Sequence, residues 1–327
     1  MIETNGRFVK MEIRQLGATD LKLSPIGLGT WQFSGGRGLI GQYWSALPDD
    51  QVREIIRICL EGSINWFDTA EIYGNGESER VLAASLQALA PLSDEARIAT
   101  KWWPIMRTAA NIPRSIGERQ KALAGRTIDL YQVHQPFSFS SAASEMKQMA
   151  KLAEQGLIRH IGVSNFSAKK MREADRTLRE HGLRLASNQV KYSLLDRQIE
   201  NNGILETAKE LGVAIIAYSP LKQGLLSGKF HRNPELLEGI SAMRRINGGV
   251  KREAVERSRP LMTRMEQLAS QYEVSPTQIA LNWLIHAHGD TVFAIPGASK
   301  PHHAAELAGA MRFKLTADEL AELGSFH

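Results

Sequence analysis

The stretch Ile64–Tyr73, which reads INWFDTAEIY, decides the fold and the chemistry of this chain. Its apolar run ends in Asp68, and Tyr73 follows five positions later. Two more short apolar segments end in a similar way, RIATK on Lys101 and IDLYQVHQP at His134. Side chains at the ends of separate strands converge only if those strands lie side by side and parallel. That arrangement is typical of the C-terminal face of a (β/α)₈ barrel.

Strand-like and helix-like segments alternate along nearly the whole chain, which predicts one α/β domain, a (β/α)₈ TIM barrel, over residues 11–327. Residues 1–10 are interpreted as an N-terminal tail. An N-terminal β-hairpin is expected from Glu12–Leu16 and Leu21–Ser24. The eight barrel strands are expected at Ile26–Leu28, Asn65–Asp68, Arg97–Lys101, Ile128–His134, Ile158–Ser164, Leu185–Val190, Ala214–Tyr218 and Val292–Ile295.

The intervening segments repeat apolar residues three and four positions apart, which is the helical period. Residues 220–259 are too long for an ordinary loop between a strand and a helix, and loops of this length are usually lids or binding segments. A doubly wound open sheet is the competing architecture. It would favour a glycine-rich dinucleotide turn directly after the first strand, where the sequence reads Gly29-Thr30-Trp31 instead.

The composition limits the classes of function. No apolar run approaches the roughly 18 residues that a membrane span needs, and the polar N-terminus shows no secretory signal. The single Cys59 excludes an internal disulfide and fits a reducing cytoplasm. The net charge is +5, but the basic residues are spread in short runs instead of being concentrated beside stacking aromatics. We therefore expect a cytoplasmic protein with no nucleic-acid or membrane partner.

The residue types at the three strand ends fit the reduction of a carbonyl group. The reaction needs a hydride, which only a nicotinamide or flavin can supply, and an acid that protonates the developing alkoxide. Tyr73 is a good acid only if its pKa is lowered, and Lys101 is a cation that would lower it. Asp68 would hold Lys101 in place and keep it charged. His134 would donate a hydrogen bond to the carbonyl oxygen and align it.

Each of these residues also has an ordinary structural interpretation. A tyrosine after a strand is often a rim residue, and a lone histidine at a strand end is often structural. Asp68 and Thr69 could instead cap a helix N-terminus. Four suitable residue types at the ends of three successive strands make coincidence the weaker explanation.

Five blocks of the sequence resemble the signature blocks of the aldo-keto reductase superfamily, in the same order and from about Met11 onward. They are INWFDTAEIYGNGESE, IDLYQVHQP, IRHIGVSNF, AYSPLKQGLLSGK and IPGASK. The resemblance implies a barrel that binds NADPH without a Rossmann fold. It also implies that Asp68, Tyr73, Lys101 and His134 are the catalytic tetrad, with Tyr73 as the acid-base residue. The double-bond reductases of the superfamily carry Glu at the fourth position, so His134 indicates a carbonyl reductase.

The resemblance also implies a cofactor site. Ser164, Asn165 and Gln189 match residues that hold the nicotinamide carboxamide, and Tyr218 matches the aromatic residue that stacks on its ring. The remaining implied positions are Gly29, Thr30, Trp31, Ser219, Leu221, Gly224, Lys229, Gly297, Ser299, Lys300, His303 and Glu306. The family often has Arg at the position of His303 and Asn at that of Leu307. Lys229 and Lys300 still favour NADPH over NADH.

Three aromatic residues, Trp31, Trp103 and Phe137, fall near the expected C-terminal loops and are predicted to line the substrate pocket. Two function classes stay open. One is a reductase of small aldehydes or ketones, and the other is a regulatory or ligand-binding protein on the same scaffold, similar to the potassium-channel β-subunits. The block AYSPLKQGLLSGK resembles the bacterial and channel-subunit-like branches of the superfamily more than its mammalian aldose reductase branch.

Four histidines near the C-terminus raise the question of a metal site. They stand at His286, His288, His302 and His303, and no cysteine or carboxylate cluster completes a set of ligands. We therefore predict no metal. The physiological substrate and the oligomeric state are open from sequence.

Overall fold

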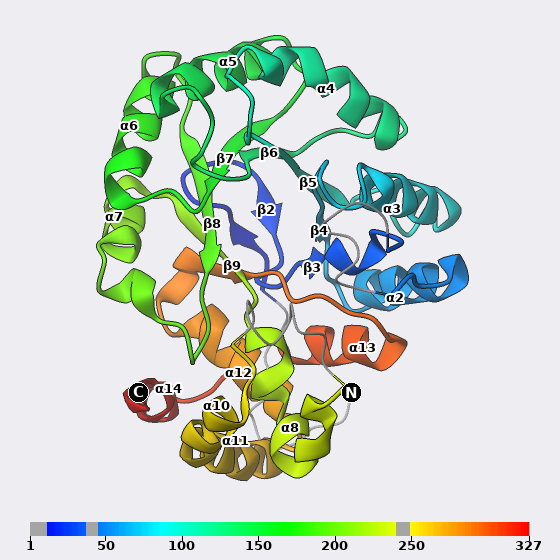
Figure 1. Ribbon diagram of the computed structural model, residues 1–327, viewed down its shortest axis with the longest axis vertical. Coiled ribbons are helices and arrows are strands. Elements are labelled where there is room, and N and C mark those ends of the chain that lie inside the picture. Colours follow the sequence, from blue (N-terminus) through cyan, green and yellow to red (C-terminus); the bar gives the residue numbers. More distant parts are fainter. Residues whose placement is uncertain (1–11, 37–44, 240–248, 327) are drawn as a thin grey trace.

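Eight parallel strands form one sheet that follows the order of the chain from β3 to β10 (Figure 1). The computed structural model describes residues 12–36, 45–239 and 249–326, so the predicted tail at residues 1–10 lies outside the described residues. Isolated parallel bridges from Ile26 to Ala294 and from Gly29 to Gly297 join the two edges of the sheet. The sheet therefore closes on itself, and the predicted (β/α)₈ barrel is confirmed.

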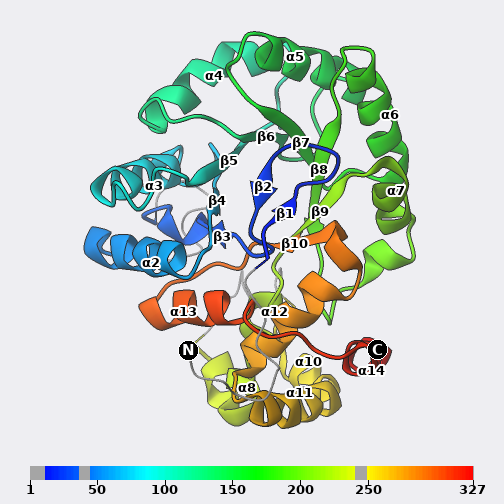
Figure 2. The ribbon, with the colours of Figure 1, turned by 180° about the vertical axis from the view of Figure 1, so that it is seen from behind.

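The barrel strands are short, and helices follow them in turn. The strands are β3 (Leu28–Gly29), β4 (Trp66–Asp68), β5 (Arg97–Trp102), β6 (Leu130–Val133), β7 (His160–Ser164), β8 (Leu185–Lys191), β9 (Ala214–Tyr218) and β10 (Val292–Ala294). The helices outside them are α2 (Asp49–Glu61), α3 (Glu77–Ala88), α4 (Asn111–Ala122), α5 (Ala142–Glu154), α6 (Ala168–Arg179), α7 (Ile204–Leu211), α12 (Pro276–His286) and α13 (Pro301–Gly309). They form a ring around the sheet in both views (Figures 1 and 2).

The predicted N-terminal hairpin is present and covers one end of the barrel. It consists of β1 (Arg14–Gln15) and β2 (Lys22–Leu23), and it lies across the sheet when the molecule is seen from behind (Figure 2). Its leucines pack with Trp66 and Phe293 inside the barrel. Gly17 has φ +56 in the turn, and a Cβ there would lie 2.7 Å from two backbone oxygens, so only glycine fits. The opposite end of the barrel stays open.

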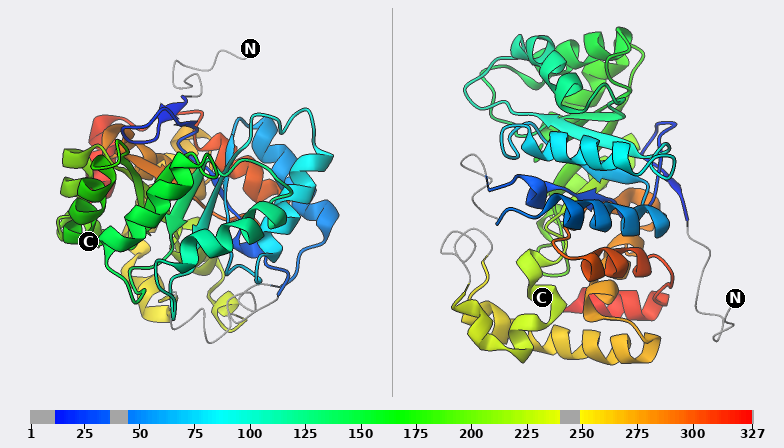
Figure 3. Two further views of the ribbon diagram at one scale, coloured as in Figure 1. Left: turned by 90° about the horizontal axis from the view of Figure 1, so that it is seen from above. Right: turned by 90° about the vertical axis from the view of Figure 1, so that its right-hand side faces the viewer.

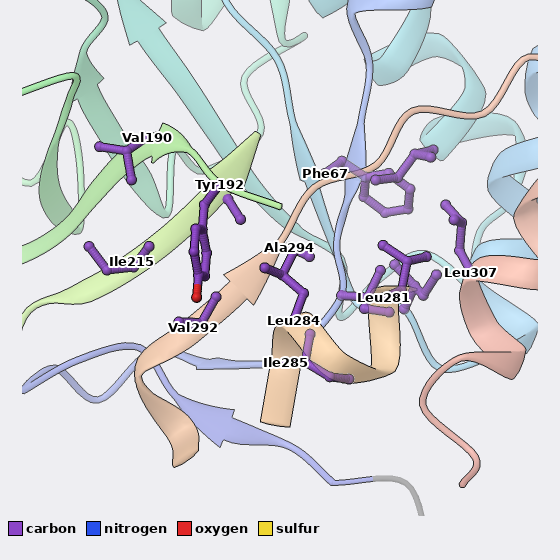
Figure 4. Packing of buried hydrophobic residues seen from close by; sticks show 14 of the residues in the cluster. Phe67, Val190, Tyr192, Ile215, Leu281, Leu284, Ile285, Val292, Ala294 and Leu307 are labelled. Carbon is purple, nitrogen blue, oxygen red and sulfur yellow. The ribbon is translucent and has the colours of Figure 1, made fainter. Parts of the chain in front are cut away.

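Successive side chains along each strand point alternately into the barrel and outward toward the helices, which gives an inner and an outer layer of packed side chains. In β4, Trp66 packs inside the barrel, while Phe67 packs outward in the main hydrophobic cluster. Figure 4 shows this outer layer, where Phe67, Val190 and Ile215 belong to one cluster with Leu281 and Leu284 of α12. Burying each such side chain stabilises the fold by about 1.5–3 kcal/mol. Asp68, the next residue of β4, is turned inward again at the open end.

The long segment after β9 contains short helices instead of one loop. They are η3 (Lys222–Ser227), α8 (Lys229–Arg232), η4 (Pro234–Leu237) and α10 (Arg252–Arg257), and α11 (Arg259–Tyr272) follows. The part of this segment at residues 240–248 is outside the described residues. The side views place the described helices α8 and α11 beside the barrel (Figure 3).

The last helix is α14 (Ala317–Ser325). Thr316 is its N-cap, and the side chains of Thr316 and Glu319 each accept a hydrogen bond from the other's backbone N–H. Among the described residues, no helix combines the length and the apolar character needed to cross a membrane.

Candidate active site

The open end of the barrel contains a cavity of about 680 Å³. Its size lies within the roughly 300–1,000 Å³ that is usual for ligand pockets. Three of the four predicted catalytic side chains line it, and Lys101 lies behind them in the barrel interior. The predicted cofactor and substrate residues that also line it are Gly29, Thr30, Trp31, Trp103, Ser164, Asn165, Gln189, Tyr218, Ser219, Leu221, Gly224, Lys229, Gly297, Ser299, His303 and Glu306.

Lys101 and Asp68 form a buried ion pair at the bottom of the cavity. The Lys101 ammonium donates a hydrogen bond to Asp68 Oδ1 and another, of 2.8 Å, to the backbone oxygen of Thr69. Burial has the largest single effect and lowers the pKa of Lys101, but the charges of Asp68 and Tyr73 and the hydrogen bonds to them together outweigh it, so the pKa lies above the ordinary value. Lys101 is therefore a permanent cation. The helix-cap interpretation of Asp68 is wrong, because α3 begins at Glu77 with Gly76 as its N-cap.

Tyr73 lies above this ion pair. Lys101 Nζ is 5.1 Å from the centroid of the tyrosine ring. Burial raises the pKa of Tyr73, and the charge of Lys101 lowers it. Burial has the larger effect, so the net pKa lies above the ordinary value of a tyrosine, contrary to the expected net lowering. The lysine acts in the expected direction, but removing the phenolate from water costs more than one cation recovers.

His134 completes the group one residue past the end of β6. Its ring lies edge-on to that of Tyr73, with 5.7 Å between the centroids and 82° between the planes. Burial and the nearby Lys101 hold the pKa of His134 well below its ordinary value, so the ring is neutral. Nδ1 is buried and finds no hydrogen-bond partner among the described residues. A neutral imidazole at this place can donate one hydrogen bond into the cavity.

Two glutamines hold the other oxygen of Asp68. Oδ2 accepts hydrogen bonds from Gln189 Nε2 at 2.9 Å and from Gln132 Nε2 at 3.1 Å. Gln189 is predicted from the sequence to hold the nicotinamide carboxamide, whereas Gln132 is not among the predicted site residues. The available signal was position alone, because Gln132 stands two residues before His134 and so points to the same interior face of the barrel.

One wall of the cavity carries the residues assigned to the nicotinamide. Tyr218 Oη donates to Asn165 Oδ1 at 3.1 Å, and Asn165 Nδ2 lies 3.2 Å from Gln135 Oε1. Ser164 Oγ donates to the backbone oxygen of Gln189 at 2.8 Å. Asn165 has φ +59, a left-handed conformation that asparagine tolerates better than most residues. These contacts fix the tyrosine ring and leave amide groups facing the cavity.

The wall beside this one is a backbone loop with several left-handed residues. Ser219, Lys222 and Gln223 have φ between +47 and +55, and Gly224 has φ +89. The backbone N–H groups of Lys222 and Gly224 donate within the loop, to the backbone oxygens of Ser219 and Leu221, both at 2.9 Å. Lys222 and Lys191 both line the cavity, and each lies 2.9 Å from Asp196 Oδ2. Neither lysine is among the site residues predicted from the sequence.

The end of the cavity near His303 carries less positive charge than the sequence predicts. Burial and the neighbouring cations lower the pKa of His303 to about 4, so this ring is neutral in the unliganded protein. Among the described residues, Lys300 does not line the cavity, and its side chain is exposed. Lys229 does line it. The firm cationic candidate at this end is therefore Lys229.

The three aromatic residues predicted for the substrate pocket lie in different surroundings. Trp31 stacks on Tyr73, with 6.0 Å between the ring centroids and 25° between the planes. Trp103 lies edge-on to His134 at 5.2 Å. Phe137 is 65% exposed and is not among the described residues that line the cavity. Its loop points its side chain toward solvent instead of the pocket.

Metal-binding side chains do not gather anywhere in residues 12–36, 45–239 and 249–326, since no group of three or more could hold an ion. The histidines have other partners. His286 Nδ1 lies 3.2 Å from Arg14 Nη2, and His288 Nε2 lies 2.7 Å from Tyr192 Oη.

Comparison with known proteins links this cavity to one family. The model of the aldo/keto reductase family matches residues 25–327. An uncharacterised oxidoreductase of Mycobacterium tuberculosis is 36% identical over 85% of this chain and 81% of its own length. The pyridoxal reductase of Arabidopsis thaliana chloroplasts is 31% identical over 93% of this chain and 83% of its own. The crystal structure of a Klebsiella pneumoniae aldo/keto reductase with NADP and acetate superposes with a TM-score of 0.71, at 26% identity over 94% of this chain and 93% of that one.

Proposed function

Because the chain belongs to the aldo/keto reductase family of oxidoreductases, we propose that it reduces small aldehydes or ketones with NADPH and uses Tyr73 as the general acid. The observation that carries the proposal is the buried Lys101, which lies between the Asp68 carboxylate and the Tyr73 ring at 5.1 Å from the ring centroid. A neutral His134 faces the same space. The retained acid, cation and hydrogen-bond donor favour turnover over a purely regulatory role.

The residues of the chain divide the reaction between them. Bound NADPH would supply the hydride, since no side chain can. Tyr73 gives its phenolic proton to the oxygen on which negative charge develops. Lys101 stabilises the phenolate that is left, and Asp68 keeps Lys101 in place. His134, which is neutral, donates a hydrogen bond to the same oxygen and orients the carbonyl.

The cavity walls fit a nicotinamide dinucleotide. Asn165 and Ser164 present amide and hydroxyl groups beside the tyrosine ring of Tyr218, which suits a planar carboxamide. The loop from Ser219 to Gly224 lines the cavity, and Lys229 adds a cation that suits a diphosphate. Lys229 also favours NADPH over NADH.

The decisive experiment measures absorbance of NADPH while aldehydes and ketones are added to the purified protein. The panel includes pyridoxal, because one relative is named as a pyridoxal reductase. We expect NADPH to be consumed in step with formation of the alcohol. Tight binding of NADPH without consumption across the whole panel would favour the regulatory or ligand-binding class instead.

The compartment is part of the same proposal. Cys59 is buried in the core, and the described residues include no disulfide partner for it. A free buried thiol fits the reducing cytoplasm, where NADPH is available. Localisation of a tagged chain by fractionation would test this.

A further inference from the structure

A buried carboxylate two residues before Tyr73 connects two loops at the rim of the cavity. Glu71 is 6% exposed. Its Oε1 accepts hydrogen bonds from the backbone N–H of Trp103 and, at 2.6 Å, from Arg107 Nη1. Its Oε2 accepts from Arg119 Nη1. Glu71 therefore joins the segment that carries the proposed acid to the loop after β5 and to α4.

Trp103 is held at both of its backbone polar groups by this arrangement. Its N–H donates to Glu71, and its carbonyl oxygen accepts from Arg107 Nη1 at 3.2 Å. Its ring lines the cavity and lies edge-on to His134. The position of one cavity wall thus depends on one carboxylate and one guanidinium.

Arg119, one of the partners of Glu71, is held in turn by a second buried carboxylate. Arg119 is buried, and its Nε lies 3.0 Å from Oε2 of Glu79. Glu79 Oε1 accepts a hydrogen bond from Thr100 Oγ1 at 2.6 Å, on the outward side of β5. Apolar side chains could fill this space without the cost of desolvating charged groups. A charged network at this place is therefore better explained by the geometry that it imposes than by stability.

We propose that Glu71 is a positioning residue, which sets the distance of the Trp103 wall from Tyr73 and His134 and so governs how tightly the carbonyl substrate is held. The proposal rests on the proposed function. Its effect should fall on KM for the substrate and on the ranking of substrates, because the residues assigned to the dinucleotide make no contact with Glu71 among its described hydrogen bonds.

The chain offers a matched control for the general cost of losing a buried carboxylate. Asp175 is 1% exposed and, like Glu71, accepts from two arginines, Arg179 and Arg184, and from a backbone N–H, that of Leu185. It lies in α6 and does not belong to the described lining of the cavity. Asp175→Asn therefore reports loss of fold stability without a change at the cavity wall.

The experiment compares Glu71→Gln, Arg107→Met and Asp175→Asn with the unchanged protein. We expect Glu71→Gln to raise KM for an aldehyde about tenfold and to reorder the substrate panel, with kcat changed less and the dissociation constant of NADPH within about twofold. Arg107→Met, which removes a side chain that is 36% exposed, should show a smaller change in the same direction. Asp175→Asn should lower the melting temperature and leave KM unchanged.

A second measurement does not depend on turnover. Hydrogen exchange of the backbone amides at residues 103 and 105–107 should speed up in Glu71→Gln and not in Asp175→Asn. Unchanged KM, ranking and exchange, with only a lower melting temperature, would reduce Glu71 to a stabilising residue and overturn the proposal. If the unchanged protein reduces no carbonyl, the proposed function fails, and the exchange measurement alone then decides whether Glu71 holds the cavity wall.

Discussion

The floor of the cavity and its dinucleotide wall are built in different ways. The floor consists of side chains on strands or just past their ends, and its ion pair of Asp68 and Lys101 is fully buried with every contact inside the barrel. The wall from Ser219 to Lys229 is a loop with left-handed residues, and its side chains range from the buried Leu225 and Leu226 to the exposed Lys229. Strand register dictates the floor, whereas only local turn geometry shapes the wall. The floor should therefore control the rate, and the wall should control which cofactor binds.

The strongest test of this division is Tyr73→Phe. The ring still packs against Trp31, but the transferable proton is lost, so reduction should fall by at least about 10²–10⁴-fold. NADPH binding should stay within about twofold, because the dinucleotide wall is untouched. Stopped-flow turnover and a fluorescence titration measure the two quantities. Substantial turnover by this variant would remove Tyr73 from the role of the acid.

Lys101→Met should have the next largest effect, a loss of about a hundredfold in rate. The pKa of Tyr73, which burial already raises, should rise further, because the cation that favours the phenolate is gone. In alcohol oxidation the phenolate accepts the proton, so the rise of the rate with pH should move to higher pH.

A control is needed because this change leaves Asp68 buried without its cation. The double variant Lys101→Met/Asp68→Asn restores electroneutrality and should recover the fold but not the rate. A pH–rate profile that stays where it is in both variants would show that Lys101 and Tyr73 are not coupled.

The same division explains how far the sequence could predict the site. The strand-end positions of Asp68, Lys101 and His134 follow from apolar runs whose alternation also sets the direction of each side chain. Gln132 lies on that same interior face and was missed, because a glutamine inside a strand carries no chemical signal of its own. The Glu71 network was missed for a different reason. Its partners come from the loop after β5, at Trp103 and Arg107, and from α4, at Arg119, and only the packing of both segments against the barrel brings them to one carboxylate.

The loops were harder to predict, because a small difference in backbone conformation decides whether a loop side chain faces the cavity or the solvent. Phe137 stands two positions after Gln135 and Lys300 stands directly after Ser299, and both of those neighbours line the cavity, yet Phe137 and Lys300 are exposed to solvent. No period of the sequence distinguishes an inward from an outward residue in such loops. The net pKa of Tyr73 was also beyond the sequence, because it depends on how deeply the phenol is buried.

Trp31→Ala tests the part of the floor that faces the substrate. An aromatic pair contributes about 0.5–1.5 kcal/mol beyond its buried area, so KM should rise about threefold to tenfold for aromatic substrates and less for small aliphatic ones. Trp31→Phe keeps a ring against Tyr73 and should retain most of the preference. Steady-state kinetics over the panel measure this. An equal loss for every substrate would indicate that Trp31 only supports Tyr73.

Lys300→Glu should have the smallest effect. It tests whether residues near the dinucleotide wall control which cofactor binds. NADPH differs from NADH by a 2′-phosphate, which carries close to two negative charges near pH 7. If Lys300 lies near that group in the complex, reversing its charge weakens NADPH and spares NADH. Because the side chain is exposed and screened by solvent, we expect a change in preference of only about twofold to fivefold.

Lys147→Glu on α5 makes the same change in net charge at an exposed position outside the described lining of the cavity, and it should leave both affinities unchanged. Fluorescence titration with both cofactors separates the outcomes. Equal behaviour of the two variants would assign the recognition of the phosphate to Lys229 instead, since Lys229 lines the cavity and Lys300 does not.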